Sequence, residues 1–432
     1  MTDLDERARA ILRANDRGGY TVPTARLYPF QWNWDSALCA LGFATFDRDR
    51  AWREVETLIE GQWKDGMIPH IVFRRSDPDY FPGPEAWGTG RRHPRGMPTS
   101  GISQPPVLAS VVRRLAANGD TERARPLVAA CDRWHRWWAD ARRDDGVTVV
   151  VHPWESGRDN CPDWDGPLDR VEVAPDLPAY VRRDTGHIDA DQRPRQEQYD
   201  RYMTIVKFGA DRDWNVDAFR RDAPFRVADP GCHFILMRAE RDLLALCREL
   251  RMGFEAEAAE SRLDALQRGA ELFWNAEVGA WTALDMRTGE RSGAASSASM
   301  LAWWGGLGMR EELTGTLAKL DAMLEASAHA VPSWDPRDAA FDGPRYWRGP
   351  VWAIVNFMIA EGLAESGHAD RAARIRADTA GLIERAGFME YFDPRDGRGL
   401  GGGEFSWTAA MWLAWCRPDA REDGLETTGE AA

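Results

Sequence analysis

The chain has 432 residues, of which 55 are Lys or Arg and 69 are Asp or Glu, so its formal net charge is −14. This acidic surplus argues against nucleic acid or an anionic membrane surface as the partner, because both repel negative charge. The first ten residues, MTDLDERARA, are polar, and no apolar run of signal-peptide or transmembrane length occurs in the sequence. We therefore expect a cytoplasmic protein that acts on a small molecule.

The sequence also argues against metal and cofactor sites. The six cysteines have no CxxC spacing, and the eight histidines show no paired metal-ligand spacing. The GGG run at 401–403 lacks the lysine of a phosphate-binding loop. We therefore expect no metal, no cofactor and no bound nucleotide.

One unit recurs along the chain: a charged amphipathic helix, a long segment without helical period, and an apolar helix. The charged helices are expected over 4–16, 51–63, 121–142, 254–275, 310–326 and 369–387. The long segments are 17–35, 64–103, 143–231, 276–296, 327–349 and 388–405. The apolar helices are expected over 36–46, 105–117, 232–250, 297–306, 350–365 and 406–416.

The apolar helices are predicted to form an inner ring. Between Val351 and Ile359, apolar side chains cover nearly the whole circumference of one helix, which therefore needs neighbours on all sides. Because consecutive antiparallel helices alternate in direction, the long segments all emerge at one end of the ring, where long loops usually carry function. We predict an all-α protein, a single (α/α)6 toroid over 1–416 with insertions at 64–103 and 143–231. The polar tail over 417–432 is expected to be disordered.

Tryptophans stand beside carboxylates in these long segments. Trp32 and Trp34 adjoin Asp35, and Trp154 lies close to Asp159. A sugar ring offers C–H faces that pack on flat aromatic rings and hydroxyls that need fixed acceptors, so aromatic walls with carboxylates suit a sugar. The loop end of the toroid is therefore predicted to hold a sugar site.

Paired carboxylates are the chemistry that this end offers. Hydrolysis of a glycosidic bond needs a protonated acid at the leaving oxygen and a second carboxylate on the opposite ring face. An apolar setting raises the pKa of the acid. Asp159 and Glu155 fit the acid, whereas Glu390 and Glu404 fit the base. The residues alone do not choose within either pair: Glu155 could only brace its segment, and Asp35 could only cap the following helix.

Five motifs carry a resemblance to a known family. They are WNWD at 32, DGMIPH at 65, WESGRDN at 154, YWRGPVW at 346 and EYFDP at 390. With them the chain resembles glycoside hydrolase family 63, and in particular its bacterial glucosylglycerate and mannosylglycerate hydrolases, from about Tyr28 to Trp412. The resemblance implies the (α/α)6 toroid and hydrolysis with inversion. It implies Asp159 as the acid and Glu390 as the base, and the related trehalases imply that Glu404 contacts sugar hydroxyls or helps to hold the attacking water.

The resemblance also implies which residues bind the substrate, a sugar with a carboxylate aglycone. Those for the sugar are Tyr28, Trp32, Trp34, Asp35, Trp154, Tyr346, Trp347 and Trp352. Those for the glycerate are His70, Tyr80, Gln104, Arg193 and Tyr199. Arg193 can chelate a carboxylate, but the same stretch also holds Arg182, Arg183, Arg195 and Arg201. The relatives suggest a homo-oligomer.

Other functions fit parts of this sequence. An α-glucosidase or trehalase-like hydrolase of neutral disaccharides would need the acid and the base but no arginine for a carboxylate. A sugar epimerase or isomerase on the same toroid would need two facing histidines, for which the long segments offer His70, His93, His152 and His187 without a convincing pair. A sugar-binding protein without catalysis would keep the tryptophans and need neither acid nor base.

Overall fold

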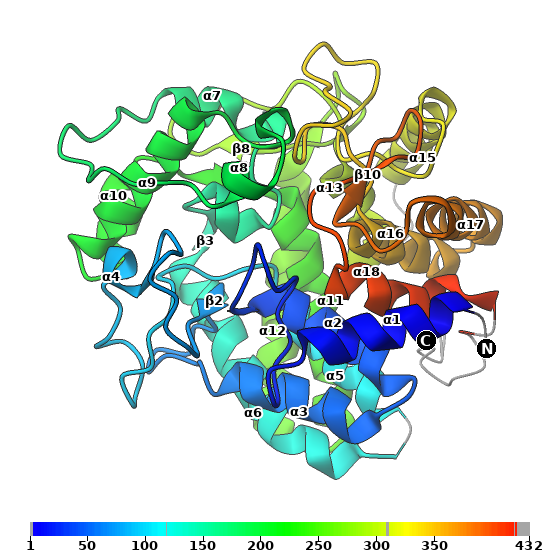
Figure 1. Cartoon of the computed structure of the whole chain (residues 1–432), viewed down its shortest axis with the longest axis horizontal. Helices are drawn as coiled ribbons and strands as arrows, with labels where there is room; N and C mark the ends of the chain where they lie inside the picture. Colours follow the sequence, from blue (N-terminus) through cyan, green and yellow to red (C-terminus); the bar gives the residue numbers. More distant parts are fainter. Residues whose placement is uncertain (1–2, 118, 308–310, 419, 421–432) are drawn as a thin grey trace.

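The computed structural model describes residues 3–117, 119–307, 311–418 and 420, and it is mostly helical (Figure 1). In this part of the chain, the apolar helices pack on one another in sequence order, and the last of them packs back on the first. They are α2 (Asn33–Ala44), α5 (Leu108–Ala116), α11 (Pro230–Glu249), α14 (Ala302–Gly305), α16 (Ala353–Glu365) and α18 (Ser406–Met411). These contacts close a ring.

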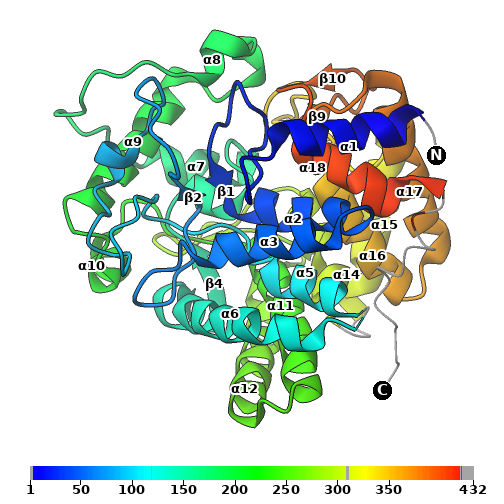
Figure 2. The ribbon, with the colours of Figure 1, turned by 60° about the horizontal axis from the view of Figure 1, so that its bottom comes forward.

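A second set of helices covers the ring from outside. These are α1 (Asp3–Asn15), α3 (Arg48–Ile59), α6 (Thr121–Ala141), α12 (Gly253–Gly269), α15 (Glu311–Ala326) and α17 (Ala369–Ala386). Each packs on an inner neighbour: for example, α3 lies on α2, α12 lies on α11, and α1 lies along α18 (Figure 2). Within the described residues, no helix has the length and apolarity needed to cross a membrane.

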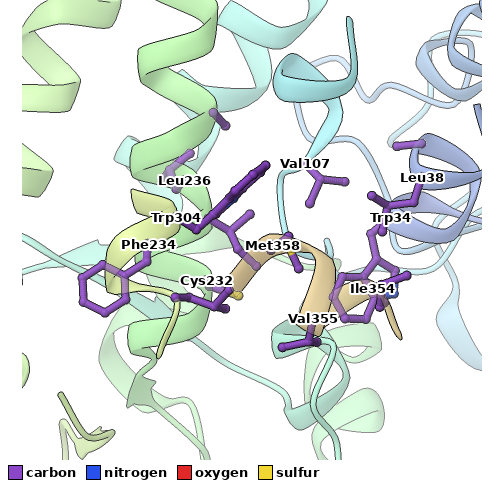
Figure 3. Close-up of a cluster of buried hydrophobic side chains, with 14 of the residues drawn as sticks. Trp34, Leu38, Val107, Cys232, Phe234, Leu236, Trp304, Ile354, Val355 and Met358 are labelled. Atoms are coloured by element: carbon purple, nitrogen blue, oxygen red, sulfur yellow. The ribbon is translucent and has the colours of Figure 1, made fainter. Parts of the chain in front are cut away.

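The core of the molecule lies inside the ring, because the inner helices bury nearly every side chain. Figure 3 shows side chains from several of these helices meeting there: Trp34, Leu38, Cys232, Phe234, Leu236, Trp304, Ile354, Val355 and Met358. Full burial of one such aliphatic or aromatic side chain is worth roughly 1.5–3 kcal/mol. The apolar surface of these helices therefore stabilises the ring as a whole.

The predicted helices are all present, with shifted ends. Helix α2 begins at Asn33 after an extended Trp32, so Asp35 lies in its first turn and does not cap it. Helix α16 begins only at Ala353 because the Val351 backbone N–H donates to the Phe392 carbonyl (2.8 Å), which keeps this stretch extended. The inner segment after residue 296 is split into α13 (Ser297–Met300) and α14, and α18 ends in the π-helix η5 (Trp412–Cys416). The predicted tail over 417–432 falls almost wholly outside the described residues.

The long segments contain regular structure that the prediction treated as loop. Their helices are α4 (Pro84–Trp87), α7 (Asp165–Asp169), α8 (Asp184–His187), α9 (Gln196–Ala210) and α10 (Val216–Asp222). Their 3₁₀ turns are η1 (Pro153–Ser156), η2 (Pro162–Trp164) and η3 (Ala190–Gln192), whereas η4 (Ala270–Phe273) continues the predicted helix over 254–275 beyond the end of α12. Helices α4, α8, α9 and α10 gather on one side of the molecule in Figure 1.

Short antiparallel strands connect these segments. One sheet has the order β3 (Arg143–Asp144), β4 (Val147–Val150), β5 (Val227–Ala228) and β8 (Leu284–Asp285). The remaining pairs are β1 (Gln31–Trp32) with β2 (Ile71–Val72), β6 (Trp274–Asn275) with β7 (Ala280–Trp281), and β9 (Tyr391–Phe392) with β10 (Gly399–Leu400). The pairing of Val150 with Val227 places the segment after β4 beside the start of α11.

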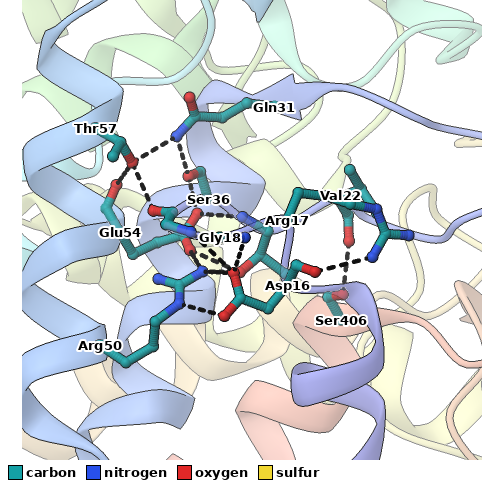
Figure 4. Close-up of polar contacts among 12 residues, drawn as sticks. Asp16, Arg17, Gly18, Val22, Gln31, Ser36, Arg50, Glu54, Thr57 and Ser406 are labelled. Atoms are coloured by element: carbon teal, nitrogen blue, oxygen red, sulfur yellow. Dashed lines mark hydrogen bonds and ion pairs between the residues drawn. The ribbon is translucent and has the colours of Figure 1, made fainter. Parts of the chain in front are cut away.

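A buried carboxylate fixes the first long segment to the ring (Figure 4). Glu54 of α3 is fully buried, and it accepts hydrogen bonds from the Thr21 backbone (3.0 Å) and the Thr21 hydroxyl (2.6 Å). Arg50 pairs with Glu54 (2.7 Å) and with Asp16 (2.9 Å), and the Ser36 hydroxyl of α2 donates to Glu54 as well. This network holds residues 17–35 in one place at the loop end of the ring.

Candidate active site

At their end of the ring, the long segments enclose a pocket of about 110 Å³. Every residue that the resemblance assigns to the site lines it except Trp347, Trp352 and Glu404. Its walls are Pro23, Leu27, Tyr28, Trp32, Trp34, Asp35, His70, Ile71, Tyr80, Phe81, Pro82, Trp87, Gln104, Trp154, Gly157, Asp159, Arg183, Asp184, Arg193, Pro194, Tyr199, Tyr346, Glu390, Phe405 and Trp407. The structure thus brings together residues from segments that are far apart in the sequence.

Asp159 lies on a tight loop after η1. Gly157 and Asn160 on either side of it both have a φ of 68°, and a Cβ on Gly157 would come within 2.8 Å of the Trp34 ring. Burial raises the pKa of Asp159 from 3.8 to about 7, against the opposing charge of Arg193 and with a smaller contribution from Glu390. A carboxyl with this pKa carries a proton in about half of the molecules at neutral pH, as an acid catalyst requires.

Glu155, the other candidate acid, does not line the pocket. Its buried carboxylate accepts hydrogen bonds from Arg142 (2.9 Å), the Ser103 backbone (3.2 Å) and the Val151 backbone (3.0 Å). These bonds use both oxygens to hold the loop in place. The structure therefore supports the interpretation of Glu155 as a brace.

Glu390 directly precedes strand β9 and is fully buried at the pocket wall. One oxygen accepts from the hydroxyls of Tyr28 (3.1 Å) and Tyr346 (3.2 Å). The other accepts from Arg193 (2.8 Å) and from the Gly402 backbone (3.0 Å). A carboxylate has about four acceptor positions, so these donors fill the carboxylate, and a water molecule has to displace one of them to reach it.

A turn of small residues makes room for this carboxylate. Gly401 has a φ of 69°, and a Cβ there would lie 2.4 Å from Glu390 Oε2. Gln192 accepts a hydrogen bond from the Gly401 backbone (2.9 Å), next to Arg193. The stretch that carries Arg193 is therefore joined to the turn that surrounds Glu390.

The predicted sugar contact of Glu404 does not fit its position. The backbone at Glu404 has a φ of 49°, and its side chain is exposed and lines a separate surface depression with Arg7 and Phe388. The Glu404 carbonyl accepts a hydrogen bond from Asn15 of α1 (3.0 Å). Of the two candidate bases, Glu390 alone lies in the pocket.

Trp347 and Trp352 also lie outside the pocket lining, one layer behind it. The two indoles stack on each other with ring centroids 3.9 Å apart and an angle of 6° between their planes. Trp347 in turn stacks on Trp34, which lines the pocket, at 6.1 Å. Both rings support the wall from behind, and neither has the place in the pocket lining that the predicted contact with a sugar requires.

The residues predicted for the glycerate lie in the pocket. Burial lowers the pKa of His70 to about 3, so this imidazole is neutral at physiological pH. Gln104 accepts from the Trp34 backbone (3.3 Å), and Tyr80 packs edge-on against Trp32 at 6.0 Å. Tyr199 of α9 completes the set.

The arginines of the 176–203 stretch differ in position. Arg193 and Arg183 line the pocket, but Arg183 is paired with Asp77 (3.0 Å). Arg182 forms a bidentate pair with Asp184 and lies over the Tyr199 ring, 4.4 Å from its centroid. Arg195 is exposed and Arg201 pairs with Asp169 (3.2 Å). Of these five arginines, Arg193 is the one that pairs with Glu390 (2.8 Å), the candidate base.

Several wall residues were not predicted, although some of them stand next to predicted residues in the sequence. Phe81 and Pro82 follow the predicted Tyr80 directly, and Trp407 lies three residues after Glu404. Trp87 and Asp184 had no distinguishing signal, because a lone tryptophan or aspartate is common anywhere in a chain, and Arg183 was named only as one of several arginines in its stretch.

The described residues offer neither the paired histidines of an epimerase nor a cluster of metal ligands. His70 is the one histidine among them that lines the pocket, whereas an epimerase needs a facing pair. No group of three or more His, Cys, Asp or Glu side chains that could hold a metal ion occurs in that same part of the chain.

Comparison with known proteins gives a consistent result. Residues 28–408 match the family described as mannosylglycerate hydrolase MGH1-like glycoside hydrolase domain. The chain is 44% identical to a mannosylglycerate hydrolase of Thermus thermophilus, with 95% of this chain and 100% of that protein covered. It is 33% identical to a glucosylglycerate hydrolase of Mycolicibacterium hassiacum, with 96% and 98% covered.

A solved structure agrees with these matches. It is the crystal structure of a GH63 mannosylglycerate hydrolase from Thermus thermophilus in complex with Tris and D-glycerate, which superposes with a TM-score of 0.91 at 43% identity and covers 96% of this chain and 100% of that chain. The resemblance predicted from the five motifs is confirmed. The chain belongs to the mannosylglycerate hydrolase MGH1-like branch of glycoside hydrolase family 63, and it is a glycoside hydrolase.

Proposed function

We propose that this enzyme hydrolyses the α-glycosidic bond of mannosylglycerate, glucosylglycerate or both, with inversion, to release hexose and glycerate. The observation that carries the proposal is that Asp159 and Glu390 line one pocket, whereas Glu155 and Glu404 do not. The names of the relatives support the substrate class, and the glycerate bound in the Thermus structure supports a carboxylate aglycone. The closed ring of inner helices supports an (α/α)6 toroid over 1–416 as a single domain.

In the proposed mechanism, Asp159 donates its proton to the glycosidic oxygen as the bond to the anomeric carbon breaks. Glu390 removes a proton from a water molecule that attacks the opposite face of the sugar. The water takes the place of one of the hydroxyl donors on Glu390 Oε1, while Arg193 and the Gly402 backbone hold the other oxygen. Trp34 and Trp154 offer aromatic surface to the sugar. The carboxylate of the glycerate lies on the side of the pocket that Arg193 lines.

The direct test is incubation of the purified enzyme with mannosylglycerate, glucosylglycerate and trehalose, followed by detection of free hexose. We expect release from one or both glycerate glycosides. Release from trehalose alone would replace this proposal with a hydrolase of neutral disaccharides.

The stereochemistry gives a second test. An inverting enzyme holds its two carboxyl groups about 6.5–9.5 Å apart so that a water fits between the base and the sugar, against roughly 5–5.5 Å in a retaining enzyme. Proton NMR of the hexose formed first from an α-linked substrate should therefore show the β-anomer before mutarotation. Initial appearance of the α-anomer would exclude inversion.

The pH dependence should report the acid. Because Asp159 acts in its protonated form and its pKa is raised to about 7, kcat/KM should fall as the pH rises through about 7. The measurement is the pH profile of kcat/KM on a glycerate glycoside, with a check that the protein stays folded at each pH. A profile that stays flat to well above this pH would show that Asp159 is not the proton donor.

A further inference from the structure

Arg158 immediately precedes Asp159 but does not line the pocket. Its side chain is 3% exposed and points into the interior, behind the loop, whereas Asp159 reaches the pocket wall. The mechanism proposed above makes no use of Arg158. A buried guanidinium beside an acid catalyst therefore needs a separate explanation.

The guanidinium joins three parts of the chain. Its Nη2 donates to Asp229 Oδ1 (2.8 Å), and its Nη1 donates to Asp163 Oδ2 (3.0 Å). The same Nη1 reaches the Cys161 sulfur (3.2 Å) and the Ser296 hydroxyl (3.4 Å). Asp163 belongs to the loop of Asp159, Asp229 begins α11, and Ser296 begins α13, so one cation fastens this loop to two inner helices.

The attachment points are themselves rigid. Asp229 is the N-cap of α11 and accepts from the backbone of Gly231 (2.9 Å) and Cys232 (3.3 Å). A Cβ on Gly231 would come within 3.2 Å of Arg158 Nε, so the helix start lies directly against the guanidinium. The loop is therefore bound to a helix end that cannot shift without losing its cap.

The main chain of Arg158 is held as firmly as its side chain. The Arg158 N–H donates to the Ser156 hydroxyl (3.0 Å), and its carbonyl accepts from the Trp164 indole (2.8 Å) and the Cys161 backbone (3.1 Å). The Trp164 ring lies under the guanidinium, 5.1 Å from its centroid. Since the next residue along the chain is Asp159, these bonds leave its backbone little freedom.

We propose that Arg158 is a positioning residue for the acid catalyst: its planar guanidinium ties the Asp159 loop to the start of α11 and thereby aims the Asp159 carboxyl at the glycosidic oxygen. This inference rests on the proposed role of Asp159. A lysine carries the same charge but cannot reproduce the fixed fork that bonds Asp163 and Asp229 together. Arg158→Lys therefore keeps the charge and loosens the loop.

The experiment compares substrates that do and do not need the acid. A glycerate glycoside needs a proton on its leaving oxygen. In an α-glycosyl fluoride the leaving group is fluoride, which departs as a stable anion and needs no proton from the enzyme. For Arg158→Lys, we expect kcat on the glycerate glycoside to fall by about 10²-fold with little change in KM, as for a misplacement of about 1 Å. Hydrolysis of the α-fluoride of the same hexose should fall by less than about threefold, because the base and the sugar contacts are unchanged.

Arg238→Lys is the matched control. Arg238 is also a buried cation, 1% exposed, and it binds Asp242 (2.7 Å) and Glu365 (2.9 Å) and lies over an indole, that of Trp304. It belongs to the middle of α11, away from the pocket lining. This variant should lower the melting temperature without a selective loss on the glycerate glycoside.

A second variant covers the case in which Arg158→Lys does not fold. Asp229→Asn retains a side chain that caps α11 but weakens the bond to Arg158, and it should show the same selective loss to a smaller extent. Equal loss on both substrates, or loss on neither, in whichever variant folds would overturn the inference.

Asp159→Asn, measured alongside, separates the two proposals. If Asp159→Asn retains hydrolysis of the α-glycosyl fluoride and Arg158→Lys loses it, the positioning role of Arg158 is wrong, whereas the assignment of Asp159 as the acid stands. If Asp159→Asn loses the fluoride as severely as the glycoside, the acid assignment fails, and the inference about Arg158 fails with it.

Discussion

Asp159→Asn and Glu390→Gln should each remove most of the activity while leaving the fold intact. A positioned acid or base contributes about 10²–10⁴-fold to a rate, and loss of the base that activates water can cost more. Asparagine at 159 cannot donate the proton at the glycosidic oxygen. Glutamine at 390 can still accept from Arg193 and the Gly402 backbone through its amide oxygen, so the buried turn keeps most of its bonds. The measurement is kcat on a glycerate glycoside, with melting temperatures to verify folding.

Glu404→Gln and Glu155→Gln are the controls for these two variants. Glu404 is exposed outside the pocket, so its variant should retain activity close to that of the wild type. Glu155→Gln should lower the melting temperature, because it weakens the bond to the buried Arg142. If Glu404→Gln were more damaging than Glu390→Gln, the base would be misassigned.

Arg193→Met should impair the enzyme in two ways that can be measured separately. The first is loss of the ion pair to Glu390, whose carboxylate is fully buried and 2.8 Å from Arg193. Breaking a buried pair typically costs about 3–5 kcal/mol, because the remaining charge stays desolvated. We therefore expect a lower melting temperature and a lower kcat on every substrate, the α-glycosyl fluoride included.

The second effect should be confined to substrates with a carboxylate. If Arg193 also binds the glycerate, its loss should weaken that contact by roughly 1.5–3 kcal/mol and raise KM for the glycerate glycoside only. Arg183→Met is the comparison, since Arg183 also lines the pocket but is neutralised by Asp77. A KM increase in Arg183→Met and none in Arg193→Met would assign the carboxylate contact to Arg183.

The helical ring could be predicted from the sequence because its inner and outer helices differ in how apolar and charged side chains are distributed around the helix, and this pattern can be read from the residue order. Apolar side chains surround α16, whereas α3 and α17 each have one charged face. Helix α9 was missed, although its buried residues Tyr199, Tyr202, Met203 and Val206 have helical spacing. Its first turn lies in an arginine-rich stretch that is typical of a loop, and this composition concealed the periodicity.

The site was predicted less completely, because the direction of a side chain depends on single backbone angles. Glu404 stands two residues after Gly402, whose backbone binds Glu390, yet a φ of 49° turns its side chain to the surface. Trp347 also has a positive φ, 55°, and lies behind Trp34 instead of beside it. Non-glycine residues adopt such angles only in a few per cent of cases, and a glutamate or a tryptophan in the sequence does not predict them.

The packing of α18 on α2 has a consequence for how the enzyme is made in a cell. Tyr28 and Glu390, which share a hydrogen bond, are 362 residues apart in the sequence. At a synthesis rate of about 5–20 residues per second, roughly 20–70 s pass between the emergence of the first wall of the pocket and that of the last. During this time Trp32 and Trp34 of the nascent chain lack the opposite wall of their pocket. The ring of apolar helices also remains open between α16 and α2, because α18 has not yet been made. Newly made enzyme should therefore depend on chaperones that shield these aromatic surfaces until translation has passed α18.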